Sequence, residues 1–249
     1  MLRFSQIITA LIFCVFSFQN TTSQNITSQD QRLWLGYITQ TRLSESFSIW
    51  NDFHWVPDGF GVLRTGGSYH FNNKLNMITT GGYAYLWFYP PSGSGTGRPE
   101  HRPWGQTTAT HRSHQFSFLH RVRYEARFRK NLVKEEFQNE FNFNFRLRYL
   151  FQARYFFPNQ TQTGKWFAMA SDEILFNAGK EISSSFRMDQ NRISLGLGFQ
   201  YKNFTVQAAY MNQIIEAPND YTFAMNHNLQ ILMFHNFDFR KKEVPLLLE

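Results

Sequence analysis

The sequence is poor in cysteine and has no long hydrophobic run. A single cysteine, Cys14, is present among 249 residues, so the chain has neither a disulfide framework nor a thiolate metal site. The longest apolar stretch, residues 7–18, is shorter than the roughly 18 residues that a membrane-spanning helix needs. The first absence excludes a disulfide-stapled domain, and the second argues against a helical membrane protein.

Motifs for common enzyme chemistry are also missing. The sequence contains no glycine-rich phosphate loop, no dinucleotide-binding fingerprint and no carboxylate pair with a glycosidase role. His101, His111, His114 and His120 are dispersed over a predicted loop and a predicted strand, so we interpret them as surface histidines and not as metal ligands. We therefore expect neither a cofactor nor a bound metal.

The first 23 residues have the features of an export signal. Arg3 supplies the positive start, an apolar centre follows, and small residues provide a cleavage site. The bulky Phe13 before Cys14 argues against a lipoprotein signal. We predict a signal peptide over residues 1–23 and a single domain over residues 24–249, located in the bacterial outer membrane.

Aromatic side chains are abundant and occupy alternating positions. Aromatics make up 18% of the chain, with 28 phenylalanines, yet the mean hydropathy is −0.43. Over residues 114–128 and 141–155, apolar and polar residues alternate almost singly. Successive side chains of a strand point to opposite faces, so each segment has one aromatic face and one arginine-rich face. Strands between lipid and a wet lumen have this pattern over about ten residues.

The same period of two predicts about ten strands, with Lys202 and Asn203 as a tight hairpin turn. A soluble β-sandwich or ligand-binding barrel has the same period but places its apolar residues inside. The longest segments exceed the five or six residues of a typical sandwich strand, which favours an all-β, antiparallel up-and-down transmembrane β-barrel. The predicted strands are residues 32–40, 46–55, 62–71, 76–89, 114–128, 141–155, 166–177, 193–201, 204–210 and 227–239.

Residues 90–110 are rich in proline, glycine and polar side chains, so we predict one long extracellular loop there. Glu100, Arg102 and Trp104 are its candidate recognition residues. Aromatic rings near strand ends are expected to form girdles at the membrane interface. The expected girdle residues are Trp50, Trp55, Trp87, Tyr89, Trp104 and Trp166.

Several local motifs together resemble a known family. They are WLGY at 34–37, EHRPWGQ at 100–106, HRVRYEARF at 120–128, DEILFN at 172–177 and NRISLGLG at 191–198. Their combination is similar to the domain of unknown function 2490 family of predicted outer-membrane barrels, common in Bacteroidota. The resemblance implies a barrel fold and brings no known activity.

Arginines dominate the face that the alternation turns inward. In a narrow barrel these side chains would meet across the lumen, where carboxylates can pair with them and plug the barrel. An excess of arginine would instead leave a positive constriction that passes anions. The predicted lumen charges are Arg121, Arg123, Glu125, Arg127, Arg146, Arg148, Arg154, Glu173 and Arg192, with Asp52 as a further acid.

We interpret the chain first as a polar-plugged barrel with a structural or binding role and no enzymatic activity. One alternative is a narrow anion-preferring pore lined by Arg121, Arg123, Arg146 and Arg148. Another is a lipid hydrolase, because His111-Arg112-Ser113 has the spacing of a base and a nucleophile on one strand.

The expected partners follow from the barrel and from its charge. They are outer-membrane lipid, the assembly machinery that reads an aromatic end of the last strand, and small anionic solutes if the lumen is open. The net charge is +7, but the arginines alternate with apolar residues and do not form a run, so we expect no nucleic-acid binding.

Overall fold

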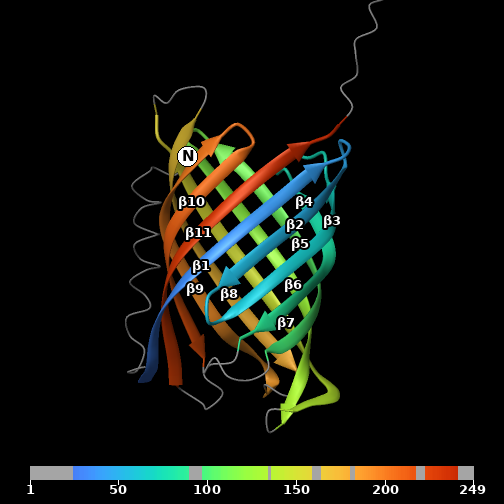
Figure 1. The fold of residues 1–249 in the computed structure, drawn as a ribbon. Helices are drawn as coiled ribbons and strands as arrows, with labels where there is room; N and C mark the ends of the chain where they lie inside the picture. The colour runs from blue at the N-terminus through green and yellow to red at the C-terminus, as the bar shows by residue number, and fades with distance from the viewer. Residues whose placement is uncertain are drawn as a thin grey trace, which may run out of the picture.

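The computed structural model describes residues 25–89, 97–133, 136–158, 164–179, 183–216 and 222–240, which form one closed sheet (Figure 1). The predicted signal peptide lies outside the described residues. Within them, no helix is both long and apolar enough to cross a membrane. The strands are β1 (Asn25–Arg42), β2 (Phe47–Val56), β3 (Phe60–His70), β4 (Ile78–Phe88), β5 (Arg98–Ser113), β6 (Phe116–Val133), β7 (Glu136–Phe156), β8 (Lys165–Gly179), β9 (Ser183–Tyr201), β10 (Phe204–Glu216) and β11 (Thr222–Asp238).

The prediction of an all-β closed barrel is confirmed. The described residues form eleven strands where the sequence indicated about ten, and the sheet is mixed and not wholly antiparallel. Each strand pairs antiparallel with its neighbours along the chain, and β1 closes the barrel by pairing parallel with β11. Eleven strands require this, because in an alternating series of odd number the first and last strands run in the same direction. Consequently β1 starts at one end of the barrel, here called the lower end, and β11 finishes at the opposite, upper end (Figure 1).

The additional strand is β5, where the sequence predicts a long loop. Arg98–Ser113 pairs with β4 from Arg98↔Phe88 to Thr108↔Ile78 and with β6 on its other side. Only residues 89–97 therefore separate β4 from β5, and the strand ends that they join, Phe88 and Arg98, lie at the lower end of the barrel. The sequence analysis missed this strand because it contains Pro99 and Pro103. Proline lacks the N–H group that hydrogen-bonds to a neighbouring strand and is rare inside strands.

Several strands are also longer than the alternation predicts. The structure extends β6 to Val133 and starts β7 at Glu136, so the expected charged connection over residues 129–136 is mostly strand. Likewise β9 starts at Ser183, ten residues before the predicted position. The hairpin at Lys202 is confirmed: Tyr201 pairs with Phe204, and Lys202 has the positive φ of 50° that such tight turns use.

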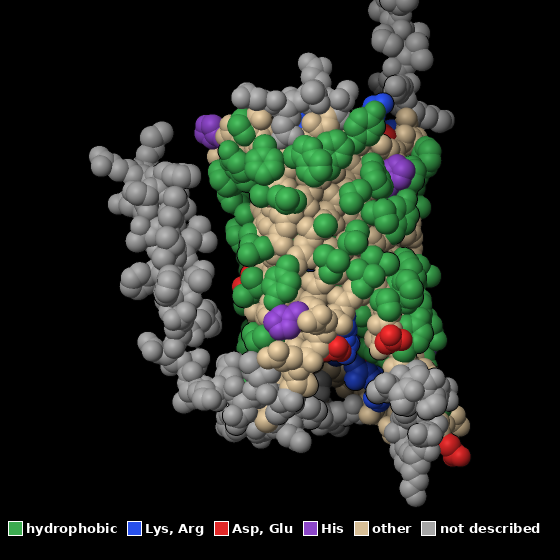
Figure 2. All heavy atoms as spheres, turned by 60° about the vertical axis from the view of Figure 1, so that its left-hand side comes forward, with side chains coloured by type: hydrophobic (Ala, Val, Ile, Leu, Met, Phe, Trp, Pro, Cys, Tyr) green, Lys and Arg blue, Asp and Glu red, His purple; other side chains and the backbone are tan. Residues whose placement is uncertain are grey.

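Large apolar side chains face outward and charged ones face inward. On β7, Phe143, Phe145 and Leu147 are 36–41% exposed, while the alternating Arg146 and Arg148 are 7% and 8% exposed. Figure 2 shows hydrophobic side chains spread over the visible described wall between areas of other side chains and backbone, with charged side chains mainly toward its ends. This distribution is the reverse of the one that a water-soluble barrel needs to bury its apolar surface.

Two strands approach closely where glycines lie opposite each other. Gly66 on β3 pairs with Gly82 on β4. A Cβ atom added to Gly82 would lie 2.0 Å from the backbone oxygen of Thr65, whereas one added to the neighbouring Gly81 would meet nothing within 4 Å. A side chain at Gly82 would therefore collide with backbone atoms of β3, which cannot move aside as the end of a flexible side chain can.

Candidate functional site

The inside of the barrel is strongly charged along β5 to β9. Every second residue of a strand points inward, so each of these strands adds charged side chains to the same face. Eight of the residues that the sequence singled out are less than a tenth exposed there: Glu100, Arg102, Arg123, Glu125, Arg127, Arg146, Arg148 and Glu173.

Glu100 is surrounded by three guanidinium groups. Its side chain is 0% exposed. Arg127 donates to it from Nε at 2.8 Å and from Nη2 at 3.1 Å, and Arg129 donates from Nε at 2.9 Å. Arg102 donates from Nε at 2.8 Å and also from Nη2. The buried carboxylate is thus fully compensated, as a charge away from water must be.

Arg148 links two further carboxylates into the same network. It donates to Glu125 from Nη1 at 2.9 Å and to Glu173 from Nε and Nη2 at 2.8–3.0 Å. Arg102 also reaches Glu125, at 3.0 Å, and Arg121 reaches Glu173, at 2.6 Å. A continuous chain of ion pairs therefore runs along the inner wall from β5 to β8.

Two separate ion pairs involve residues that the sequence analysis missed. Arg64 donates to Asp52 at 2.7 Å, and Arg146 donates to Asp189 at 2.6 Å. The weak alternation of β3 gave Arg64 no recognisable face, and Asp189 precedes the predicted start of β9. Asp189 is the unpaired residue at a register shift between β8 and β9, where Leu175 pairs with Gln190 and Phe176 with Met188, and this shift interrupts the period of two.

The residues assigned to a recognition loop belong to the lumen. Glu100, Arg102 and Trp104 lie on β5 and are buried, so their prediction as loop residues is wrong. Trp104 is 4% exposed and lies beneath the guanidinium of Arg123, whose Cζ is 5.1 Å from the ring centroid. The wrong assignment arose because β5 was not predicted as a strand, and alternation along that strand turns these three residues inward.

The expected aromatic girdle is also partly wrong. Trp50, like Trp104, points inward, and its Nε1 donates to Asp52 at 2.9 Å. Trp55 and Trp166 instead lie on the outer surface and are 40% and 54% exposed. The inward tryptophans serve as hydrogen-bond and cation–π partners of the lumen charges.

Some arginines of the lumen have neutral partners in place of carboxylates. Arg123 donates to Gln106 at 2.9 and 2.7 Å, and its distance to Glu125 is 3.9 Å. Arg154 donates to Gln207 at 3.2 Å and lies over the ring of Phe167. These guanidinium groups keep a positive charge that no carboxylate of the described residues neutralises at hydrogen-bond distance.

Besides Nε1 of Trp104, three buried guanidinium nitrogens lack any hydrogen-bond acceptor among the described residues. They are the Nε atoms of Arg121, Arg154 and Arg192. Arg192 spends its other donors on Gln190, at 2.8 Å, and on Glu173, at 3.5 Å. An unsatisfied buried donor is costly, so such atoms mark positions where a ligand or water can supply the acceptor.

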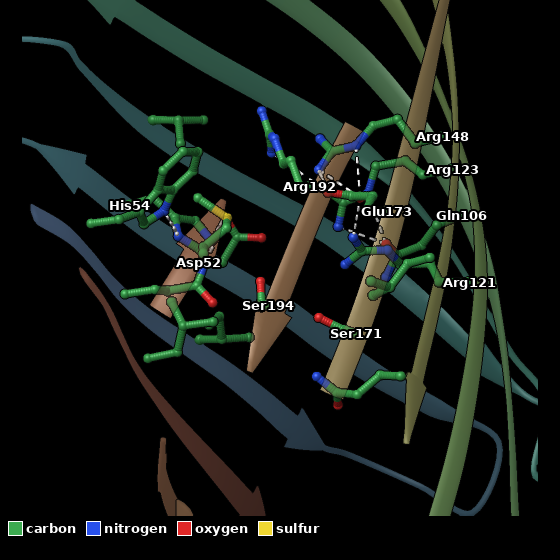
Figure 3. A pocket seen from close by; sticks show the side chains of 18 of the residues that line it. Asp52, His54, Gln106, Arg121, Arg123, Arg148, Ser171, Glu173, Arg192 and Ser194 are labelled. Carbon is green, nitrogen blue, oxygen red and sulfur yellow. Dashed lines mark hydrogen bonds and ion pairs between the residues drawn. The ribbon is translucent and has the colours of Figure 1, made fainter. Parts of the chain in front are cut away.

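These side chains line a cavity of about 770 Å³ that occupies the lumen. Its lining comes from strands all around the barrel and has two unlike sides (Figure 3). One side carries the arginines, and the other carries the apolar cluster of Trp34, Ile38, Val56, Met211 and Leu232. The lining includes three acids, Asp52, Glu173 and Asp189, against twelve arginines: Arg32, Arg64, Arg102, Arg112, Arg121, Arg123, Arg127, Arg129, Arg146, Arg148, Arg154 and Arg192.

The His-x-Ser pair lies on the outer surface near the upper end of β5. The His111 ring stacks on Phe118 and on His120, with centroid distances of 5.0 and 6.0 Å. The Ser113 hydroxyl lies 3.4 Å from Nδ1 of His114. Among the described residues, no hydrogen bond joins His111 to Ser113, so the structure does not bring the base and the nucleophile together.

Outward histidines are paired with tyrosines on adjacent strands. His120 lies 2.9 Å from the Tyr149 hydroxyl and His227 lies 2.6 Å from that of Tyr210, while His101 contacts Tyr83 in the same way. Each pair satisfies polar atoms on an otherwise apolar surface. In the part of the chain that is described, histidine, cysteine and acidic residues form no group of three or more able to hold a metal ion.

Comparison with known proteins agrees with the resemblance in the sequence. The family model described as a protein of unknown function, DUF2490, matches residues 31–226, which is most of the chain. No curated protein matches the sequence. The chain that builds this arginine-lined barrel therefore belongs to the DUF2490 family.

Proposed function

We propose that the protein is an integral β-barrel of the bacterial outer membrane whose lumen is a narrow, anion-preferring passage. The observation that carries the proposal is the inside-out distribution of side chains around an arginine-rich cavity. The N-terminal export signal expected from the sequence would deliver the chain to that membrane.

The outer surface supports a location in lipid. Apolar side chains alternate with the buried charges along strands such as β9, where Leu195 and Leu197 are 59% and 54% exposed. Exposing this surface to water would forfeit the hydrophobic stabilisation of a folded domain, whereas lipid accommodates it. Pairing of every strand on both sides leaves no open sheet edge, which a membrane also requires.

The extent of the cavity supports a passage. Its lining includes Phe88 and Arg129, near the lower end of β4 and β6, together with Gln200 and Asn236, near the upper end of β9 and β11. The cavity thus extends between the two ends of the barrel. Its surplus of arginine over carboxylate would favour anions and repel cations.

Ion selectivity in a planar bilayer tests the proposal. Protein refolded in detergent and shown to be folded by its gel mobility before and after heating is inserted into a bilayer with a tenfold KCl gradient. We expect discrete conductance steps and a reversal potential of the sign for chloride. Cation selectivity in verified folded protein would contradict the proposed passage.

Variants that remove charge without exposing a carboxylate sharpen this test. Arg123→Gln and Arg154→Gln each remove a lumen cation whose hydrogen-bond acceptor is a neutral glutamine. Both should reduce the selectivity for chloride. Lys74→Gln is the matched control, since it removes one positive charge from an exposed connection between β3 and β4 and should leave selectivity unchanged.

A closed binding barrel is the second candidate function. Two arginines reach across the lumen: Arg192 of β9 lies over Trp34 of β1, and Arg154 of β7 lies over Phe234 of β11. Such bridges narrow the passage. If protein that is shown to be folded gives no conductance steps in the bilayer, this candidate is favoured, in which the cavity holds a ligand and does not conduct ions.

A further inference from the structure

The centre of the lumen places a cationic wall opposite an apolar wall. Figure 3 shows Arg121 and Arg123 on one side and the side chains around Asp52 and His54 on the other. Arg192 lies between them, with its guanidinium over the Trp34 ring. The residues packed on that second side are buried and mostly apolar, namely Trp34, Ile38, Val56, Met211 and Leu232. A molecule between the two walls would therefore meet charge on one face and hydrocarbon on the other.

The cationic wall contains hydrogen-bond donors without an acceptor among the described residues. Arg121 and Arg192 both pair with Glu173, yet the Nε atom of each lacks an acceptor within the described residues. Glu173 is already shared with Arg148, so one carboxylate serves three guanidinium groups. Arg123 is the third cation of this wall, and the side chain that accepts its hydrogen bonds, Gln106, is neutral. Ser171 and Ser194, which pair with each other two residues along β8 and β9 from Glu173 and Arg192, have hydroxyls that can donate further hydrogen bonds (Figure 3).

We propose that this central cavity recognises an amphipathic anion, with its oxyanion headgroup against Arg121, Arg123 and Arg192 and its apolar tail against the wall of Trp34, Met211 and Leu232. The proposal deepens the anion-preferring lumen argued above and rests on it for the preference in charge. It adds the apolar half of the ligand.

The chemistry of both walls limits the class of ligand. Guanidinium forks match carboxylate, phosphate and sulfate oxygens, and their bonds to an anion are stronger than those to neutral acceptors. A bare inorganic anion would leave the apolar wall uncovered, and a neutral lipid would leave the buried Nε donors unsatisfied. The volume of about 770 Å³ lies within the range of about 300–1,000 Å³ that accommodates small organic ligands.

The test uses 8-bromooctanoate, an amphipathic anion whose bromine quenches tryptophan fluorescence on contact. The full-length protein is reconstituted in neutral phosphatidylcholine vesicles, so that the lipid itself does not attract the probe by charge. We expect saturable quenching, because Trp34, Trp50 and Trp104 line or underlie the cavity. The double variant Arg121→Gln/Arg192→Gln should bind at least about tenfold more weakly, since it removes two charge-assisted contacts. Lys74→Gln should bind like the wild type.

Two matched probes separate charge from hydrocarbon. Acetate should not compete with 8-bromooctanoate at equal concentration, and 8-bromooctanol should give no saturable quenching of the inward tryptophans. Equal affinity of wild type and the double variant, equal binding of the alcohol, or competition by acetate as strong as that by octanoate would each overturn the proposal. Trp34→Phe should remove part of the quenching, which reports contact with the apolar wall.

Failure of this inference is distinguishable from failure of the proposed passage. Anion-selective conductance that octanoate does not block, together with no saturable quenching, would leave the passage standing and reject the amphipathic ligand. Saturable quenching by 8-bromooctanoate in protein that does not conduct would reject the passage and support the ligand site.

Discussion

The ion-pair network makes a quantitative prediction about Glu100. In the variant Glu100→Gln, the amide keeps one acceptor oxygen but presents an NH₂ group to guanidinium donors, which cannot accept from it. Arg102 retains Glu125, whereas Arg127 and Arg129 lose the only carboxylate at hydrogen-bond distance from either of them among the described residues. Because Arg127 is only 3% exposed, water has little access to its guanidinium once the carboxylate is gone.

We expect Glu100→Gln to lower the free energy of unfolding by about 3–5 kcal/mol, the usual cost of leaving a buried ion pair without one partner. The assay is guanidinium-induced unfolding of protein folded in detergent or vesicles, followed by tryptophan fluorescence. Glu45→Gln is the control: Glu45 also pairs with arginines, Arg42 and Arg240, but its side chain is 81% exposed, so we expect no measurable change.

A double-mutant cycle tests the physical cause. Arg127→Gln removes one cation from the Glu100 cluster, so the double variant Glu100→Gln/Arg127→Gln should recover part of the lost stability. The coupling energy should lie within about 0.5–3 kcal/mol, as for other residues in direct contact. A loss of stability in Glu100→Gln no larger than that in Glu45→Gln, or zero coupling with Arg127, would refute the reasoning that this buried pair holds the wall together.

Other features of the structure give three further predictions. Gly82→Ala should destabilise by about 1–3 kcal/mol because its Cβ meets the Thr65 backbone, whereas Gly81→Ala should be neutral; equal unfolding curves would argue against the close approach. Asp172, held by Asn191 at 2.7 Å on the outer surface, should be better replaced by leucine in lipid: Asp172→Leu should stabilise by about 1 kcal/mol in vesicles, and destabilisation there would oppose a lipid-facing wall. Ser113→Ala should leave phospholipid hydrolysis at the wild-type background, since Ser113 and His111 are not hydrogen-bonded; loss of a measurable rate would revive the hydrolase alternative.

The lumen network was predictable only where alternation was strong. On β6 and β7, aromatic residues mark one face so clearly that Arg123, Glu125 and Arg148 could be assigned to the other face from the sequence. The partners of these residues could not be assigned in the same way. Arg148 contacts Glu125 and Glu173 because the pairing registers of β6, β7 and β8 bring the three residues together. Those registers depend on strand pairing around the whole barrel.

Strand β5 was missed because its sequence has no clear alternation of apolar and polar residues. Both faces of β5 carry polar or turn-forming residues, so the hydrophobic period that identifies a strand is absent there. Pairing with β4 and β6 overrides the weak local preference, as tertiary context often does in sheets. Three buried lumen residues, Glu100, Arg102 and Trp104, were placed in a loop for this reason.

The residue pattern alone is enough to predict long amphipathic strands with aromatic and arginine-rich faces, because side chains alternate along any extended backbone. Three features follow from the fold of the whole chain: the parallel β1–β11 pair that closes eleven strands, the ion-pair partners of the lumen arginines, and the apolar wall inside the lumen. Closure and register join residues far apart in the chain, and a local pattern contains no information about which strands become neighbours.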